Sequence, residues 1–239
     1  MLKFSQDYRV GLRNDFVALM DYVQQACLHH TYSTPGGMEY YEQAGLVWVL
    51  THWHVELDEL PAPADVINVS TWPVIFKSYF GERGFELRQG EKSLLRANSN
   101  WMLINRNSLK PTRADAQLAQ KYGEPQSFLM TKDFSMPKAA DFEFFGRHEY
   151  IATRRDIDNN QHVNNISYLQ WISDVLPAGL IQRVPRILKV AYKKEVLCGD
   201  AVEILMHRRG DDEIFVIIEK GGKTTTEIYI SWKKEKGGC

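Results

Sequence analysis

The pattern of apolar and polar positions predicts a helix near the start of the chain. Apolar side chains recur three or four positions apart over Asp15–Thr31, which is the spacing of one helix face. They are Phe16, Leu19, Met20, Val23 and Cys27. Asn14 or Asp15 suits the N-cap, because a short polar side chain accepts a hydrogen bond from a free backbone N–H. The Pro-Gly-Gly run at residues 35–37 predicts a loop after this helix.

Strands are predicted to follow this loop. Runs rich in β-branched and aromatic residues are separated by turn residues such as Gln89-Gly90-Glu91. The predicted strands are Leu46–Leu57, Val66–Trp72, Lys77–Arg88 and Ser93–Ile104.

The second half of the chain repeats the same order of elements. Asn164–Gln182 has the apolar period of a helix, and runs with strand composition follow it. These runs are Ile187–Val196, Ala201–Arg208, Glu213–Glu219 and Lys223–Trp232. A local echo supports the repeat, since Asp65-Val66-Ile67-Asn68-Val69 resembles Asp200-Ala201-Val202-Glu203-Ile204.

Each half is therefore a strand, a helix and an antiparallel run of strands. One helix cannot cover both faces of a twisted sheet, but it can fill one concave face. We predict an α+β fold of two tandem hotdog domains, each an antiparallel sheet wrapped around a central helix. The expected domains are residues 1–106 and 145–239. The irregular, proline-containing linker 107–144 lies between them, with a short helix expected near Ala114–Tyr122.

Composition restricts the function classes. The chain has 239 residues, a net charge of -1 and 44% hydrophobic residues, so a dominant basic surface for nucleic acid is excluded. The sequence contains no apolar run long enough for a membrane span, and residues 1–10 have neither the apolar core expected of a signal peptide nor the composition of a transit peptide. Its widely spaced cysteines, Cys27, Cys198 and Cys239, suit neither a disulfide framework nor a zinc site, and we expect a reducing cytoplasm.

No Gly-rich phosphate loop follows a strand, so no nucleotide cofactor is expected. His52 and His54 lack a third ligand, so no metal is expected either.

The candidate site is the polar segment Asp156–Asn165, which precedes the second helix. Asp and Asn are favoured at turns and helix caps, so each residue alone has a structural explanation. The first half, however, enters its helix through Gly11-Leu12-Arg13-Asn14-Asp15 without such a cluster. Capping does not require the additional polar groups, and a helix start also offers free N–H groups to an oxyanion. The asymmetry predicts a site in the second half only, with the first half forming much of the pocket beside it.

This segment resembles the signature of a known family. Its Asp-x-Asn-x-His-Val-Asn-Asn-x-x-Tyr pattern, at residues 158–168, is similar to that of plant and bacterial acyl-carrier-protein (acyl-ACP) thioesterases. Trp48-Val49-Leu50-Thr51 and Tyr192-Lys193-Lys194-Glu195 resemble parts of the family's two sheets. The resemblance implies hydrolysis of fatty acyl-ACP to free fatty acid and carrier protein. It places the catalytic residues at Asp158, Asn160, His162 and Glu195 and implies no cofactor. Plant members have a cysteine where this chain has Val196, which disfavours a covalent cysteine intermediate.

The residue types fit thioester hydrolysis by an activated water. Asp158 and Glu195 are both candidates for the base, and the sequence does not choose between them. His162 can orient a carboxylate and move a proton, and Asn160 can hold the water or the carbonyl oxygen. Glu195 is expected on a strand, and Cys198 is expected to be buried and inert.

Two other functions remain open: an acyl-CoA thioesterase with the same chemistry, and a non-catalytic acyl-binding hotdog protein. A basic run favours the acidic carrier protein as partner; it comprises Arg183, Arg186, Lys189, Lys193 and Lys194. A homodimer also stays open.

Overall fold

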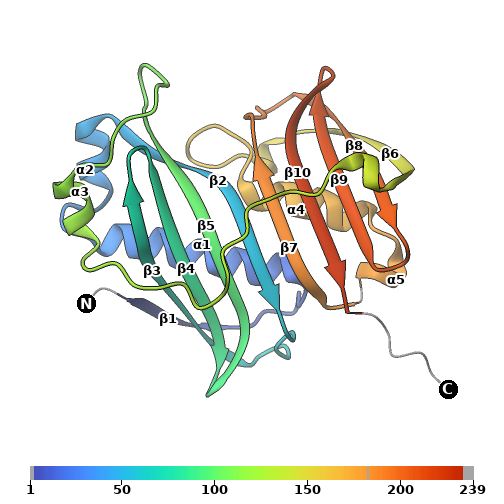
Figure 1. Ribbon diagram of the computed structural model, residues 1–239, viewed down its shortest axis with the longest axis horizontal. Helices are drawn as coiled ribbons and strands as arrows, with labels where there is room; N and C mark the ends of the chain where they lie inside the picture. The colour runs from blue at the N-terminus through green and yellow to red at the C-terminus, as the bar shows by residue number, and fades with distance from the viewer. Residues whose placement is uncertain (1–2, 182, 234–239) are drawn as a thin grey trace.

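The computed structural model describes residues 3–181 and 183–233, and within them ten strands form one continuous sheet (Figure 1). The first half contributes β1 (Phe4–Arg9), β2 (Leu46–Leu57), β3 (Val66–Lys77), β4 (Phe80–Gln89) and β5 (Lys92–Asn105). The second half contributes β6 (Glu143–Ile151), β7 (Pro185–Tyr192), β8 (Ala201–Arg209), β9 (Glu213–Lys220) and β10 (Lys223–Trp232).

The strand order confirms the internal repeat. It runs β1-β3-β4-β5-β2 and continues as β7-β10-β9-β8-β6, so the second half repeats the first in reverse across the sheet. All neighbouring strands pair antiparallel, and the halves join where Trp53 of β2 lies opposite Val190 of β7. The architecture is the predicted tandem hotdog.

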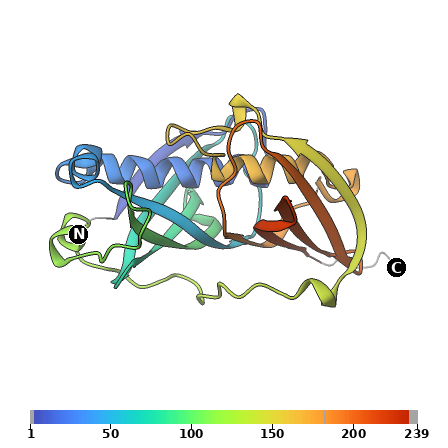
Figure 2. The ribbon, with the colours of Figure 1, turned by 90° about the horizontal axis from the view of Figure 1, so that it is seen from above.

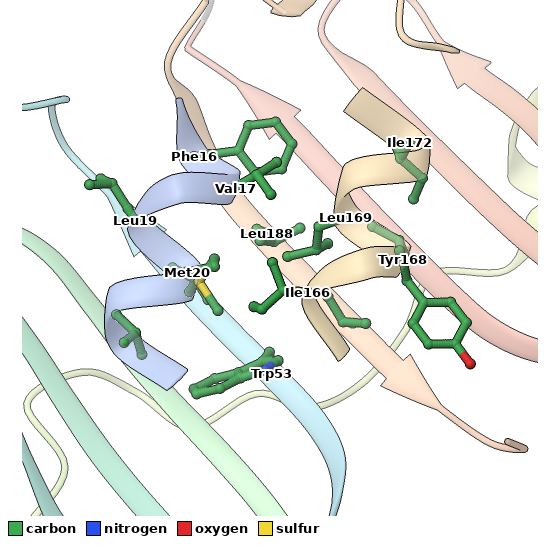
Figure 3. Packing of buried hydrophobic residues seen from close by; sticks show 14 of the residues in the cluster. Phe16, Val17, Leu19, Met20, Trp53, Ile166, Tyr168, Leu169, Ile172 and Leu188 are labelled. Carbon is green, nitrogen blue, oxygen red and sulfur yellow. The ribbon is translucent and has the colours of Figure 1, made fainter. Parts of the chain in front are cut away.

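Two helices lie one after the other along one face of the sheet, α1 (Phe16–Ser33) in the first half and α4 (Asn165–Val175) in the second (Figure 2). Asp15 caps α1 through its Oδ1, which accepts from the N–H of Ala18 at 2.8 Å. Apolar side chains of both helices pack on the centre of the sheet (Figure 3); among them are Leu19, Met20, Ile166 and Leu169, against Trp53 and Leu188. Burial of these faces is the main stabilising term of the fold.

The second helix is shorter than predicted. α4 ends at Val175, and Pro177, which has no N–H and restricts the residue before it, separates it from the short α5 (Ala178–Ile181). The expected end at Gln182 lies outside the described residues. A second difference is α2 (Gly37–Ala44), which forms where a loop was predicted after residues 35–37.

The segment after β5 includes the expected short helix, α3 (Ala116–Lys121), and then crosses the face of the sheet opposite α1 and α4 (Figures 1 and 2). Side chains of the sheet hold it there. Trp72 Nε1 donates to the carbonyl of Ser127 at 3.1 Å, and Lys189 Nζ lies 2.5 Å from Asp133 Oδ2. Among the described helices, none has the length and apolar character that crossing a membrane requires.

Strand β7 ends earlier than predicted, and this changes the position of Glu195. After Tyr192 the N–H groups of Lys193 and Lys194 both donate to the carbonyl of Thr225, at 2.7 and 3.1 Å, and the regular ladder stops. Glu195 therefore lies in the loop between β7 and β8. The prediction that Cys198 is buried is wrong, because it rested on an extended strand that does not reach this far; Cys198 is exposed.

Candidate active site

Asp156 anchors the polar segment to the fold. Its Oδ2 accepts from both the N–H and the hydroxyl of Thr153 at 2.7 Å, and its Oδ1 accepts from Trp171 Nε1 at 2.9 Å. Its carbonyl accepts from the N–H of Asn164 at 2.7 Å. Both oxygens of this buried carboxylate are thus used inside the protein, and Asp156 is a structural residue.

Asp158 organises the turn that follows. Its Oδ1 accepts from the N–H of Asn160 at 2.8 Å and, more weakly, from that of His162 at 3.4 Å. Its own N–H donates to the carbonyl of His162 at 2.9 Å, and Gln161 takes a left-handed φ of 67°. The carboxylate therefore fixes the backbone from which the side chains of Asn160 and His162 project.

His162 contacts Glu195 across two loops. Its Nε2 lies 3.2 Å from Glu195 Oε2, and the N–H of Val163 donates to the carbonyl of Val196 at 2.9 Å, which aligns the loops. The side chains are 38% and 49% exposed, so water reaches the pair. Glu195, and not Asp158, is the carboxylate in contact with the imidazole.

A largely apolar cavity reaches the polar segment at Asn160, two residues before His162 in the chain. Its volume is about 110 Å³, and it is open to solvent at its mouth. Its lining residues come from α1, α2 and strands β2 to β5, from Arg106 and Tyr122, which directly follow β5 and α3, and from Asn160 of the second half. Since Asn160 is exposed, it marks an open edge of the cavity, where the two halves meet.

The first turn of α4 has fewer free N–H donors for an oxyanion than the sequence suggested. Asn164 caps it, with Oδ1 accepting from the N–H of Ile166 at 3.0 Å and from Gln24 Nε2 of α1 at 2.8 Å. The carbonyl of Asn164 accepts from the N–H of Ser167 at 2.9 Å. Most donors of this turn already have partners. The Asn160 carboxamide donates one N–H of Nδ2 to Asp158 Oδ2 at 3.4 Å, and its second N–H is left for an oxyanion.

The basic run does not form one surface. Lys189 is buried against Asp133, and Arg183 and Lys193 form ion pairs with Asp212 and Glu227. The remaining members, Arg186 and Lys194, are exposed near opposite ends of β7, which is about 25 Å long at the usual strand rise. Alternation along a strand turns successive side chains to opposite faces, so a run in the sequence is not a patch in space.

Comparison with known proteins identifies the chain. The model of the acyl-ACP thioesterase N-terminal domain matches residues 6–122, and that of the C-terminal domain of the same family matches residues 140–234. The chain belongs to the acyl-ACP thioesterase family. The two matches follow each other in the family's order and leave out little besides residues 123–139 and the ends.

Members of the acyl-ACP thioesterase family from plants are similar to this chain. The oleoyl-ACP thioesterase 2 of Arabidopsis thaliana chloroplasts is 26% identical over 182 residues, which are 71% of this chain and 49% of that protein. The palmitoyl-ACP thioesterase of the same organism is 27% identical over 207 residues, 76% of this chain and 47% of that protein. The chain spans about half the length of the curated relatives that it matches.

Solved structures of the family share the fold. A structure described as an acyl-ACP thioesterase from Bacteroides thetaiotaomicron superposes with a TM-score of 0.81 at 23% identity, covering 96% of this chain and 97% of the other. The 12:0-ACP thioesterase from Umbellularia californica gives a TM-score of 0.83 at 19% identity and 98% coverage of both chains.

Sequence reasoning missed the polar wall of the cavity. Arg83, Tyr41 and Tyr122 all line it, and all are buried. β4 also contains Glu82, Glu86 and Arg88, so its sequence contained no signal that singled out Arg83.

Proposed function

We propose that this protein hydrolyses fatty acyl-ACP to free fatty acid and carrier protein, with Asp158, Asn160, His162 and Glu195 as its working residues. The supporting observation is the His162–Glu195 contact, accessible to water, together with an apolar cavity that Asn160 of the same polar segment borders. The apolar lining suits an acyl chain whose thioester stays at the open edge. Family membership supports the same reaction.

Glu195 is the proposed base. It takes a proton from a water molecule, whose oxygen then attacks the thioester carbonyl carbon. The Asn160 carboxamide is the proposed donor to the carbonyl oxygen as that oxygen gains charge. Asp158 is a positioning residue, because its carboxylate holds the N–H groups of Asn160 and His162.

The second half of the reaction returns the proton. When the tetrahedral intermediate collapses, the C–S bond breaks and the fatty acid forms. Glu195 passes the proton that it took from water to His162 Nε2, 3.2 Å away, and His162 donates this proton to the departing thiolate. Water supplies all the atoms added, and no covalent acyl-enzyme is required.

The deciding experiment is hydrolysis by the wild-type protein over acyl-ACP and acyl-CoA substrates of graded chain length. We expect turnover of long acyl-ACP and a lower kcat/KM for the matched acyl-CoA. Absence of hydrolysis with every acyl-ACP would refute the proposed function. If the protein hydrolyses only acyl-CoA, its substrate is acyl-CoA and not acyl-ACP.

A variant of Lys194 tests whether the acidic carrier protein docks next to the proposed site. It is exposed, follows β7 and directly precedes Glu195. If it contributes to docking an acidic protein, Lys194→Glu should lower kcat/KM with acyl-ACP about threefold to tenfold at low salt, and rising salt should reduce the difference. A short neutral thioester should be hydrolysed equally by both proteins.

Lys110→Glu, the same charge change at an exposed position of the linker, is the matched control for this test. Equal losses in both variants, or a loss that salt does not reduce, would contradict docking at Lys194.

The proposed site is complete within one chain, so the reaction needs no second copy. Sedimentation of the active protein tests the homodimer that remains open. The free thiols of Cys27 and Cys198 support the proposal of a reducing compartment such as the cytoplasm.

A further inference from the structure

Arg83 is a buried charge in the wall of the acyl cavity. It projects from β4 and is 7% exposed. Its Nη2 donates to His30 Nδ1 at 2.5 Å, and Nη2 and Nε approach Thr71 Oγ1 at 3.3 and 3.4 Å. Its guanidinium carbon lies 5.4 Å from the ring centre of Tyr122. Within residues 3–181 and 183–233, Nη1 has no hydrogen-bond acceptor, although a guanidinium offers five N–H donors.

No described carboxylate forms an ion pair with Arg83, and its titratable neighbours are neutral. Burial and the adjacent Arg83 charge lower the pKa of His30 to about 3, so the imidazole is uncharged at neutral pH. Burial raises the pKa of the Cys27 thiol and of the Tyr122 phenol, so neither supplies a negative charge. A cation held this way lacks the counter-charge that buried ions normally have.

The hydroxyl groups of the cavity wall do not use the remaining guanidinium donors, because they bond to one another. Trp48 Nε1 donates to Tyr41 Oη at 3.3 Å, and Tyr41 Oη lies 2.6 Å from Tyr122 Oη. Tyr122 Oη lies 3.5 Å from Thr31 Oγ1, which donates to the carbonyl of Cys27 at 3.2 Å. One direction of donation satisfies this whole chain, so among the buried side chains of the wall the unfilled donors are those of Arg83. Arg106, which also lines the cavity, is exposed to water, and its Nε donates to the carbonyl of Leu46 at 3.2 Å.

We propose that the cavity receives an acyl chain bearing an oxygen acceptor, and that Arg83 binds this oxygen. The inference rests on the proposed function and adds the substrate class. A plain alkyl chain leaves the N–H groups of the guanidinium without an acceptor. A carboxylate accepts two parallel hydrogen bonds from them and supplies the missing negative charge. A hydroxyl or keto oxygen supplies acceptors without the charge. Asn160 borders the same cavity at the proposed thioester position, so the oxygen belongs on the chain beyond the reacting carbonyl.

The test compares thioesters of N-acetylcysteamine whose acyl chains have equal length and end in methyl, hydroxyl or carboxylate. This small thiol removes the carrier from the comparison. We expect wild-type protein to hydrolyse at least one oxygen-bearing chain with a kcat/KM at least tenfold above the methyl-ended chain. If the preference is larger for the carboxylate, the group that Arg83 binds is an anion. If it is larger for the hydroxyl, that group is a neutral acceptor.

Arg83→Met retains an unbranched side chain and removes the donors. It should abolish the preference for an oxygen-bearing chain over the methyl-ended chain. Arg88→Met, on the same strand but outside the cavity lining, is the matched control and should keep the preference. If Arg83→Met does not fold, Arg83→Gln, which keeps two N–H donors, should retain part of the hydroxyl preference and lose the carboxylate preference.

Several results would overturn the proposal. One is equal or better hydrolysis of the methyl-ended chain by wild type. Another is a shift of Arg83→Met toward longer alkyl chains with no change between chain ends, which would make Arg83 a stop for chain length. If the protein hydrolyses no thioester, the proposed function fails, and calorimetric binding of the same three thioesters tests Arg83 separately. Equal affinity for all three would then exclude recognition of oxygen.

Discussion

Replacing Glu195 by Gln should separate catalysis from folding. The substitution keeps the size of the side chain and removes the charge that contacts His162 Nε2 at 3.2 Å. Loss of a positioned general base lowers rates by about 10²–10⁴, which corresponds to about 3–5 kcal/mol of activation free energy. The ion-pair geometry contributes little to stability, because the two side chains are 49% and 38% exposed and such pairs are worth about 0–1 kcal/mol.

The expected result is a large fall in kcat with a free energy of unfolding within about 1 kcal/mol of wild type. Turnover of acyl-ACP under saturating substrate gives the first quantity, and urea denaturation followed by circular dichroism gives the second. A single-turnover measurement shows whether the loss is in the chemical step.

Glu227→Gln is the matched control. Glu227 lies in β10 and contacts Lys193, and its side chain is 19% exposed, so the carboxylate is near the site without contacting His162. It should reduce stability by about 1 kcal/mol and leave kcat within about threefold. The assignment of Glu195 as base is wrong if Glu195→Gln keeps the wild-type rate, or if both variants lose the same factor.

Three further variants test other parts of the site and the fold. Asp158→Asn keeps an oxygen that can accept from the N–H of Asn160, so its kcat should fall less than that of Asp158→Ala; the reverse order would make the Asp158 charge itself catalytic. Cys198→Ala should retain most turnover, and trapping of an acyl group on Cys198 would contradict direct attack by water. The Lys189 ammonium holds the pKa of Asp133 well below its usual range, so Asp133→Asn should destabilise by about 1 kcal/mol near neutral pH. A depressed pKa stabilises the fold above the unfolded value near 4, so the difference from wild type should shrink as pH falls below about 4; a constant difference in urea midpoints across that range would show that the charge is not involved.

Much of the fold was predictable because its signals are local. Apolar period and cap residues predicted a helix beginning at the cap Asp15, and strand composition predicted Leu46–Leu57, the observed bounds of β2. The repeat predicted two equivalent halves, since each half carries its own pattern. The polar segment Asp156–Asn165 stood out by comparison with the first half, which needs no structure.

The limits of the sequence lay where contacts join distant segments. It did not show that β7 stops at Tyr192, because the end of a strand depends on its hydrogen-bonding partner as well as on its own residues. It did not choose between Asp158 and Glu195 for the contact with His162, because the pairing depends on the relative position of two loops. The basic run failed as a patch for a related reason, since Lys189 takes its partner from the crossing segment.

The sequence by itself determined the repeat, the elements and the residue types of the site. The tertiary structure decided which groups meet: Asn160 of one half borders a cavity lined by the other, and Arg83 faces that cavity without an anion. Periodicity along a chain reports which face of an element is apolar. Only the packing of elements on one another determines what that face contacts and which buried charge is left without a partner.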